Sequence, residues 1–264
     1  MRRLIVSLFI ALAVFVAFHL FYPDLSKLKK TNPKKTAMME YREAEWNEEG
    51  KKYRIIQKWV PLRAISPYLV KAVLIGEDDK FWQHEGFDYE AMQKAIEKDI
   101  KEKRIKLGGS TISQQLVKNL YLSPSKNPVR KLREAIITWR MEKVLPKKRI
   151  LELYLNVAEW GDKGIFGAEA AARHYYGKPA SALTAEEAAR LAAVLPNPRK
   201  FNPLGNSRYV VHRSNLIYSI MVRRGIVVPE YEELESEEKP DGGGGTITEP
   251  SQPAAIEDVR PSSQ

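Results

Sequence analysis

Between residues 66 and 225, helix-start signals repeatedly precede stretches in which apolar residues recur at helical spacing. Residues 111–114 read Thr-x-x-Gln and residues 184–187 read Thr-x-x-Glu, the pattern of a capping box at a helix N-terminus. A last helix is expected over 207–224, and Gly225 would end it because glycine tolerates the left-handed conformation that closes a helix. We therefore predict a mainly α fold for this part of the chain.

Proline positions set the limits of two further helices. Ser66-Pro67 predicts a start, and the apolar residues that follow carry this helix to Glu77. Another helix is predicted to begin at Asn127 and to end before Pro146. In this second helix we expect a buried apolar stripe of Val129, Leu132, Ile136 and Trp139, with Arg130, Arg133 and Glu134 lying away from it.

The 264-residue chain contains no cysteine, which excludes disulfides, cysteine-ligated zinc, iron–sulfur clusters and thiol nucleophiles. Its chemistry must come from carboxylates, histidines, hydroxyls and cations. Residues 1–228 hold 41 basic and 23 acidic side chains, a formal charge of +18, whereas the remainder is acidic. Such a cationic region suits nucleic acid, an anionic membrane surface or a phosphorylated substrate, and composition does not choose among them.

Residues 4–22 carry no charged side chain, and 19 such residues span about 28 Å as a helix, enough to cross a bilayer. The run ends in Phe21-Tyr22-Pro23-Asp24, without the small-residue pattern of a signal-peptidase site. We therefore expect an uncleaved membrane anchor rather than a buried core helix. Basic residues flank the run on both sides, so the positive-inside rule does not fix its orientation.

Three consecutive carboxylates, Glu77, Asp78 and Asp79, follow an apolar helix face. Anionic side chains are unfavourable at the C-terminal end of a helix dipole, which favours a functional role over a chance acidic helix end. Glu77 is nearest the apolar face, where desolvation raises the proton affinity of a carboxylate and suits it to act as a general base. His84 has no second histidine at metal-ligand spacing, so we expect it to be structural and predict no zinc site.

A glycine pair, Gly108-Gly109, precedes Ser110-Thr111 at the start of a predicted helix. Free amides at the positive end of a helix dipole suit a phosphate or diphosphate group. Lys118 follows Thr111 by seven residues and therefore lies on the same side of this helix. No Walker sequence is present, so nucleotide hydrolysis is not expected.

Arg130 and Glu134 are spaced as a helical ion pair, which by itself indicates a solvated surface contact. With the features above, they complete four ordered motifs that resemble the family 51 glycosyltransferases. The motifs are Glu77-Asp78 through His84-x-Gly86, Gly108-Gly109-Ser110-Thr111-Ile112-Ser113-Gln114-Gln115 with Lys118-Asn119, Arg130-Lys131-x-x-Glu134, and Arg149-Ile150-Leu151-Glu152-x-Tyr154-Leu155-Asn156. The resemblance covers roughly residues 55–225, and the absence of a transpeptidase region makes the chain similar to the monofunctional biosynthetic peptidoglycan transglycosylases of that family.

This resemblance implies a lysozyme-like helical glycosyltransferase domain that polymerises lipid II into β-1,4-linked glycan strands and releases undecaprenyl diphosphate. It implies that Glu77 is the base that deprotonates the acceptor hydroxyl. It also implies that Glu134 is a second catalytic carboxylate, which assists departure of the diphosphate together with Lys118 and Arg130. The residues implied to bind the substrate or to shape its site are Asp78, Phe81, His84, Ser110, Thr111, Gln115, Lys118, Asn119 and Arg130, and those implied to be structural are Glu152 and Asn156.

The implied cofactor is a divalent cation, Mg²⁺ or Mn²⁺, with no organic cofactor. The implied partners are lipid II, the growing glycan strand, membrane lipids and cell-division or elongation proteins, and nucleic acid is not expected. We expect a single-pass protein of the bacterial inner membrane with its catalytic domain on the periplasmic side. A basic run at 98–106 fits a membrane-facing surface and a solvated helix face equally well.

The chain is predicted to divide into five segments. They are a cytoplasmic N-terminus at 1–3, a transmembrane anchor at 4–22, a juxtamembrane linker at 23–52, a glycosyltransferase domain at 53–228 that opens with a short strand at 53–60, and a disordered acidic tail at 229–264.

Two other functions stay open at this point. One is a lysozyme-like enzyme that cleaves finished glycan strands. The other is a membrane-anchored nucleic-acid-binding protein, which the absence of a basic motif interleaved with aromatic residues disfavours.

Overall fold

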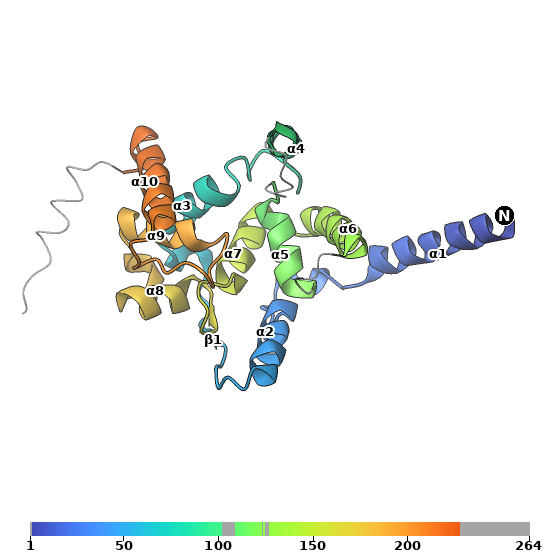
Figure 1. Cartoon of the computed structure of the whole chain (residues 1–264), viewed down its shortest axis with the longest axis horizontal. Helices are drawn as coiled ribbons and strands as arrows, with labels where there is room; N and C mark the ends of the chain where they lie inside the picture. Colours follow the sequence, from blue (N-terminus) through green and yellow to red (C-terminus); the bar gives the residue numbers. More distant parts are fainter. Residues whose placement is uncertain (1, 102–108, 123, 125–126, 228–264) are drawn as a thin grey trace, which may run out of the picture. The chain divides into compact units, whose positions relative to one another are not determined.

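A computed structural model of the chain describes residues 2–101, 109–122, 124 and 127–227. Gly108, the side chains of the basic run at 98–106 and the predicted acidic tail lie outside the described residues. Figure 1 shows a mainly helical arrangement. The described helices are α1 (Arg2–Phe21), α2 (Ala37–Glu48), α3 (Pro67–Glu77), α4 (Tyr89–Lys101), α5 (Ile112–Tyr121), α6 (Pro128–Val144), α7 (Lys147–Val157), α8 (Ala168–Tyr176), α9 (Ala185–Val194) and α10 (Arg208–Arg223), with 3₁₀ turns η1 (Ser26–Lys29), η2 (Leu62–Ala64) and η3 (Ala180–Ala182).

The strand content of the described residues is small. β1 (Ile56–Gln57) pairs in parallel with β2 (Ile165–Phe166), with Ile56 opposite Ile165. The strand expected at 53–60 is therefore present but only two residues long. The mainly α prediction is confirmed.

The predicted helix starts are confirmed by the side chains that cap them. Thr111 and Thr184 each form a complete capping box with the residue three positions later. The side chains of Asn127 and Ser207 accept hydrogen bonds from backbone N–H groups in the first turns of α6 and α10. Ser66 stands at the start of α3 as expected, but its hydroxyl donates to the carbonyl oxygen of Leu183 and does not cap the helix.

The core of the described residues brings two sets of helices together. α3 packs against α9 and α10, and α5 packs against α6 and α7 (Figure 1). A single cluster of buried apolar side chains includes members of both sets, such as Leu69 of α3, Leu116 of α5 and Leu191 of α9. This packing sets the C-terminal end of α3 and the N-terminal end of α5 beside each other, because the Asp78 carboxylate accepts a hydrogen bond from the Ile112 N–H at 2.9 Å.

The segment predicted as a linker at 23–52 is folded onto the rest of the domain. It contains α2, which Thr36 caps and which contacts α5. Met38, Met39 and Trp46 of this helix are buried. The sequence pattern is weak because only a few apolar residues stand among many charged ones, so the helix was missed although its apolar residues reach the core.

The buried face of α6 differs from the prediction. Three of the four expected stripe residues face outward, with 51 % of Val129, 45 % of Leu132 and 49 % of Trp139 exposed, and Ile136 is partly buried. The residues buried instead are Glu134, Ile137, Thr138 and Met141. Apolar side chains occur on two faces of this helix, and packing against α5 selects the face that also carries Glu134. Periodicity alone could not distinguish between them.

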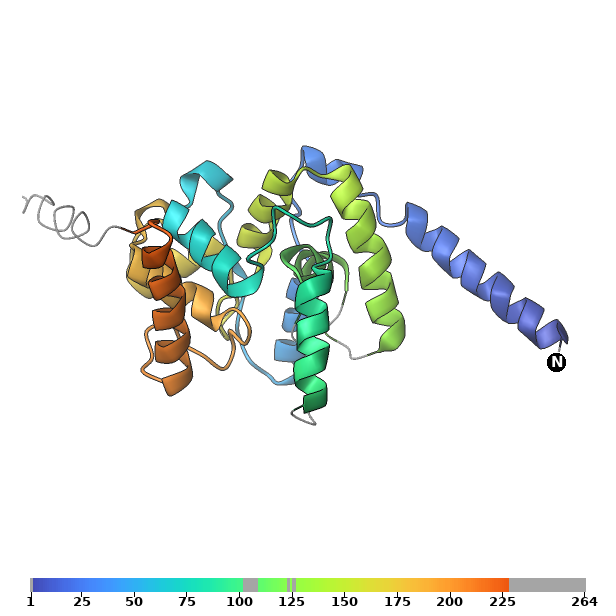
Figure 2. The same ribbon diagram turned by 90° about the horizontal axis from the view of Figure 1, so that it is seen from above.

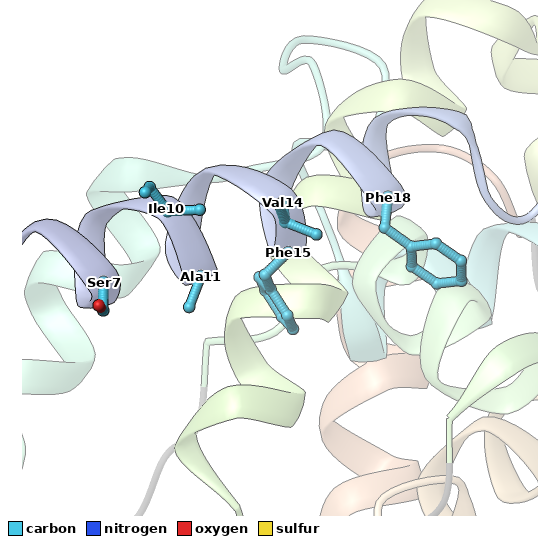
Figure 3. Close-up of a pocket in the computed structure, with 6 residues that line it drawn as sticks. All are labelled: Ser7, Ile10, Ala11, Val14, Phe15 and Phe18. Atoms are coloured by element: carbon cyan, nitrogen blue, oxygen red, sulfur yellow. The ribbon is translucent and has the colours of Figure 1, made fainter.

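α1 covers nearly all of the predicted anchor. Among the residues that the structure describes, no helix is both long enough and apolar enough to cross a membrane. The anchor at 4–22 therefore stays a prediction. α1 contacts α6 (Figure 2). Just beyond α1, Nη2 of Arg140 donates to the carbonyl oxygen of Pro23 at 3.0 Å. A shallow hollow on α1 is lined by residues of this helix, namely Ser7, Ile10, Ala11, Val14, Phe15 and Phe18 (Figure 3).

We predict that Trp46→Ala lowers the free energy of unfolding by about 3–5 kcal/mol, because it leaves a cavity where α2 packs on the domain. Tyr41→Ala in the same helix is the control, since 39 % of Tyr41 is exposed, and it should cost less than about 1 kcal/mol. Urea unfolding of the full chain in detergent, followed by circular dichroism, measures both. Equal, small losses would return residues 37–48 to the role of a linker.

Candidate active site

A cleft of about 650 Å³ opens where α3 ends and α5 begins, and residues near the end of α9 and the start of α10 complete it. Among the residues predicted for the site, those that line this cleft are Glu77, Asp78, Ser110, Thr111, Gln115 and Lys118. The hollow on α1 contrasts with it, since none of its six lining residues is ionisable. The cleft is therefore the candidate site for acid–base chemistry and anion binding.

Glu77 is the last residue of α3, and only 8 % of its side chain is exposed. Its Oε2 accepts a hydrogen bond from Nε2 of Gln115 at 2.8 Å, and its Oε1 lies 3.2 Å from Nη2 of Arg213. Burial raises the pKa of the Glu77 carboxyl, while Gln115, Arg213 and Lys118 oppose the rise. The result is a desolvated carboxylate with a raised proton affinity, the property that a general base needs near neutral pH.

Asp78 holds the floor of the cleft together. One carboxylate oxygen accepts the Ile112 N–H at the start of α5, and the other lies 2.9 Å from Nε2 of His84. Nδ1 of His84 accepts a hydrogen bond from the Gly86 N–H, so the ring is used on both sides. The Thr111 hydroxyl donates to the Gly86 carbonyl oxygen at 2.7 Å. Asp78 and His84 thus brace the loop after α3 against α5, which fits the structural role expected for this histidine.

Glu134 is buried, with 3 % of its side chain exposed. Nη1 of Arg130 donates to one carboxylate oxygen at 2.7 Å, and Nζ of Lys131 pairs with the other. The spacing of Arg130 and Glu134 is therefore an ion pair as the sequence indicates, but it lies on the inner face of α6 and not on a solvated surface.

Lys118 connects the two carboxylates electrostatically. Burial and the cations of Arg130 and Lys131 lower the pKa of the Lys118 ammonium, while Glu134 and Glu77 raise it. One partly buried lysine therefore interacts electrostatically with both acidic residues. Lys118 lines the cleft with Glu77, whereas Glu134, Arg130 and Lys131 are not among the lining residues. The catalytic roles of Glu77 and Glu134 stay predictions.

Two residues implied to bind the substrate are buried. Phe81 is fully buried, and Nζ of Lys147 lies 4.4 Å from the centroid of its ring. Asn119 is 8 % exposed. Phe81 presents no surface to the cleft, so in this structure it shapes the site from below and does not contact a ligand.

The implied divalent cation was compared with the ligands that the chain offers. In the part of the chain that the structure describes, no group of three or more His, Asp or Glu side chains could hold a metal ion. Both carboxylate oxygens of Glu134 are engaged by Arg130 and Lys131. Mg²⁺ is commonly held by one or two carboxylates together with substrate phosphates and water. The divalent cation therefore stays a prediction, and the cations that the described residues place near Glu134 are Lys118, Arg130 and Lys131.

A transglycosylase family model matches residues 45–222, which include the whole cleft. The chain belongs to the transglycosylase family. It is 46 % identical over 221 residues to a biosynthetic peptidoglycan transglycosylase of Nitrosospira multiformis, covering 84 % of this chain and 96 % of that protein. Proteins with the same description from Laribacter hongkongensis and Dechloromonas aromatica are 48 % and 53 % identical, over 78 % and 65 % of this chain and 90 % and 74 % of theirs.

Three residues at or beside the cleft of this transglycosylase were not predicted from the sequence. Arg213 and Tyr209 of α10 line the cleft, and Tyr154 of α7 donates a hydrogen bond to Gln115. Tyr154 stands inside the fourth motif, which could have drawn attention to it. Arg213 is separated from Glu77 by 136 positions, and no local spacing indicates their contact.

We predict that Glu77→Gln stabilises the folded protein more at pH 8 than at pH 4. Burial raises the pKa of Glu77 in the folded state, so the folded protein binds this proton more tightly than the unfolded chain does. The free energy of unfolding contributed by Glu77 is therefore full below the unfolded pKa and is lost as the pH rises through the folded pKa. A glutamine has no such loss.

Urea unfolding of the variant and the parent at both pH values measures the difference. Glu97→Gln, which removes an exposed carboxylate from the interior of α4, is the matched control and should show the same difference at both pH values. A pH-independent effect of Glu77→Gln would contradict a raised pKa.

Proposed function

We propose that this chain polymerises lipid II into β-1,4-linked glycan strands of the bacterial cell wall. The observation that carries the proposal is that two largely buried carboxylates, Glu77 and Glu134, both interact electrostatically with Lys118. All three residues lie inside the region that the transglycosylase model matches. The relatives named biosynthetic peptidoglycan transglycosylases support synthesis over the lytic alternative. No feature of the described residues favours nucleic-acid binding.

Glu77 acts as the general base. It takes the proton from the 4-hydroxyl of the acceptor N-acetylglucosamine as the oxygen attacks the anomeric carbon of the growing strand's terminal muramoyl unit. The new carbon–oxygen bond forms as the bond from that carbon to the diphosphate oxygen breaks, and the configuration inverts. Undecaprenyl diphosphate leaves with the electron pair.

The negative charge that develops on the leaving diphosphate requires cations placed in advance. Lys118 lines the cleft, and Arg130 and Lys131 lie around Glu134 on α6. Glu134 orients Arg130 and Lys131 through its two carboxylate oxygens and opposes the effect of burial on the pKa of Lys118. Ser110 and Thr111 contribute the start of α5, whose positive dipole end also suits an anionic group.

A location at the inner membrane follows from the substrate and from the surface of the protein. Lipid II is a membrane lipid, and confinement of enzyme and substrate to one surface raises their effective concentration. We propose that residues 4–22 anchor the chain, with the catalytic domain on the periplasmic side. The outward apolar stripe of α6, formed by Val129, Leu132 and Trp139, lies on the helix that contacts α1 and would rest at the same bilayer.

We predict that Glu77→Gln reduces polymerisation of labelled lipid II to below about 1 % of the parent rate, because general-base catalysis supplies about 10²–10⁴-fold. Glu134→Gln should lose about 100-fold, since the cations at the leaving group lose their anchor. Glu186→Gln is the control and should keep full activity. Gel analysis of the glycan products measures all three, and cleavage of finished strands without polymerisation would support the lytic alternative.

We predict that residues 4–22 hold the parent chain in bacterial membranes during alkaline carbonate extraction, and that the double variant Ala11→Asp, Val14→Asp is released. Each aspartate at the centre of a spanning helix costs about 2.5–3.5 kcal/mol. Thr31→Asp, Asn32→Asp adds the same charge outside the uncharged run and should stay bound. Release of the parent chain itself would exclude the anchor without affecting the proposed reaction.

A further inference from the structure

Both oxygens of the Glu77 carboxylate are held by side chains from other helices. Gln115 of α5 donates from Nε2 to Oε2 at 2.8 Å. Arg213 of α10 lies 3.2 Å from Oε1 through Nη2, and the same nitrogen donates to the Gly76 carbonyl oxygen at 2.6 Å. The guanidinium is thereby fixed to the end of α3, next to the carboxylate that it pairs with.

Tyr154 determines which end of the Gln115 amide faces Glu77. Its hydroxyl lies 3.0 Å from Oε1 of Gln115 and donates to it. Burial, and the nearby carboxylates of Glu77 and Asp78, raise the pKa of Tyr154 well above its ordinary value, so the phenol stays a neutral donor. With Oε1 occupied by this donor, the amide presents its NH₂ group to Glu77. A flipped amide would place its oxygen against the carboxylate.

We propose that Tyr154, Gln115 and Arg213 are positioning residues that together hold Glu77 in the orientation, and in the charge state, in which it accepts the acceptor's proton. This inference rests on the proposed function of Glu77. It changes the role of Gln115 from the substrate contact that the resemblance implies to a contact with the base. Gln115 has no titratable group, Tyr154 stays a neutral phenol, and Arg213 contacts the carboxylate itself, so each acts on the reaction through Glu77.

The pH dependence of the reaction separates this role from simple support of the fold. The charged and titratable groups that face Glu77 are Arg213 from α10, Lys118 from α5 and Tyr154 from α7. Gln115 and Arg213 both lower the pKa of Glu77 against the effect of burial. Loss of either contact should therefore protonate Glu77 at a higher pH, and the acidic limb of the rate profile should move upward in pH.

The experiment measures kcat/KM for lipid II polymerisation against pH with the full chain in detergent. We expect the acidic limb to move to higher pH in Tyr154→Phe, and further in Arg213→Met, while Arg213→Lys keeps the charge and should move less. KM for lipid II should change little, because these residues act on the base. Tyr176→Phe is the matched control, since Tyr176 is a partly buried tyrosine whose buried hydroxyl has no hydrogen-bond partner in the described structure, and its profile should equal that of the parent.

Parent-like pH profiles in folded Tyr154→Phe and Arg213→Met would overturn the inference. Tyr154→Phe keeps the ring and carries the test if Arg213→Met does not fold, with thermal unfolding reporting the folded state. Glu77→Gln separates the two levels of the argument. If that variant stays active, the assignment of the base fails. If it is inactive and the other profiles do not move, only the positioning role fails.

Discussion

The contact between the Asp78 carboxylate and the N-terminus of α5 is the constraint on which the site depends. A carboxylate at the end of α3 is disfavoured by the dipole of its own helix, but here it accepts the first free N–H of another helix, where a negative charge is favoured. The other two carboxylates of the cluster also have partners, since Glu77 pairs with Arg213 and Asp79 with Arg224. The acidic run thus connects the end of α3 to other helices through hydrogen bonds and ion pairs.

The contact between Asp78 and the start of α5 sets where the side chains of α5 lie relative to Glu77. Because α5 begins where α3 ends, Gln115 and Lys118 come to lie one and two turns into α5 on the side of Glu77. α6 packs on α5 with Glu134 buried, and this second carboxylate also interacts electrostatically with Lys118. The cationic surplus of residues 1–228 is then partly used to hold two buried carboxylates in place.

The parts of the fold that follow local rules could be predicted from the sequence, and those decided by distant contacts could not. Thr111 and Thr184 predict the starts of their helices because a capping box involves only four consecutive residues. α2 was missed because Trp46 finds its core partners outside its own segment. The inner face of α6 was assigned to the wrong residues, since Glu134 is buried by its ion partners and by α5 rather than by any periodicity. Arg213 was missed for the same reason.

Opposed effects on the pKa of Glu77 explain how the proposed base can be both charged and reactive. Burial alone would leave the carboxyl protonated and useless as a base, whereas full solvation would leave it too weak. The hydrogen bond from Gln115 and the nearby charges of Arg213 and Lys118 offset part of the burial. Burial lowers the pKa of Lys118, and Glu77 and Glu134 both oppose this effect. In the proposed reaction the proton taken up by Glu77 would remove one of these two anions from the surroundings of Lys118, at the moment when the leaving diphosphate supplies another negative charge for the lysine to stabilise.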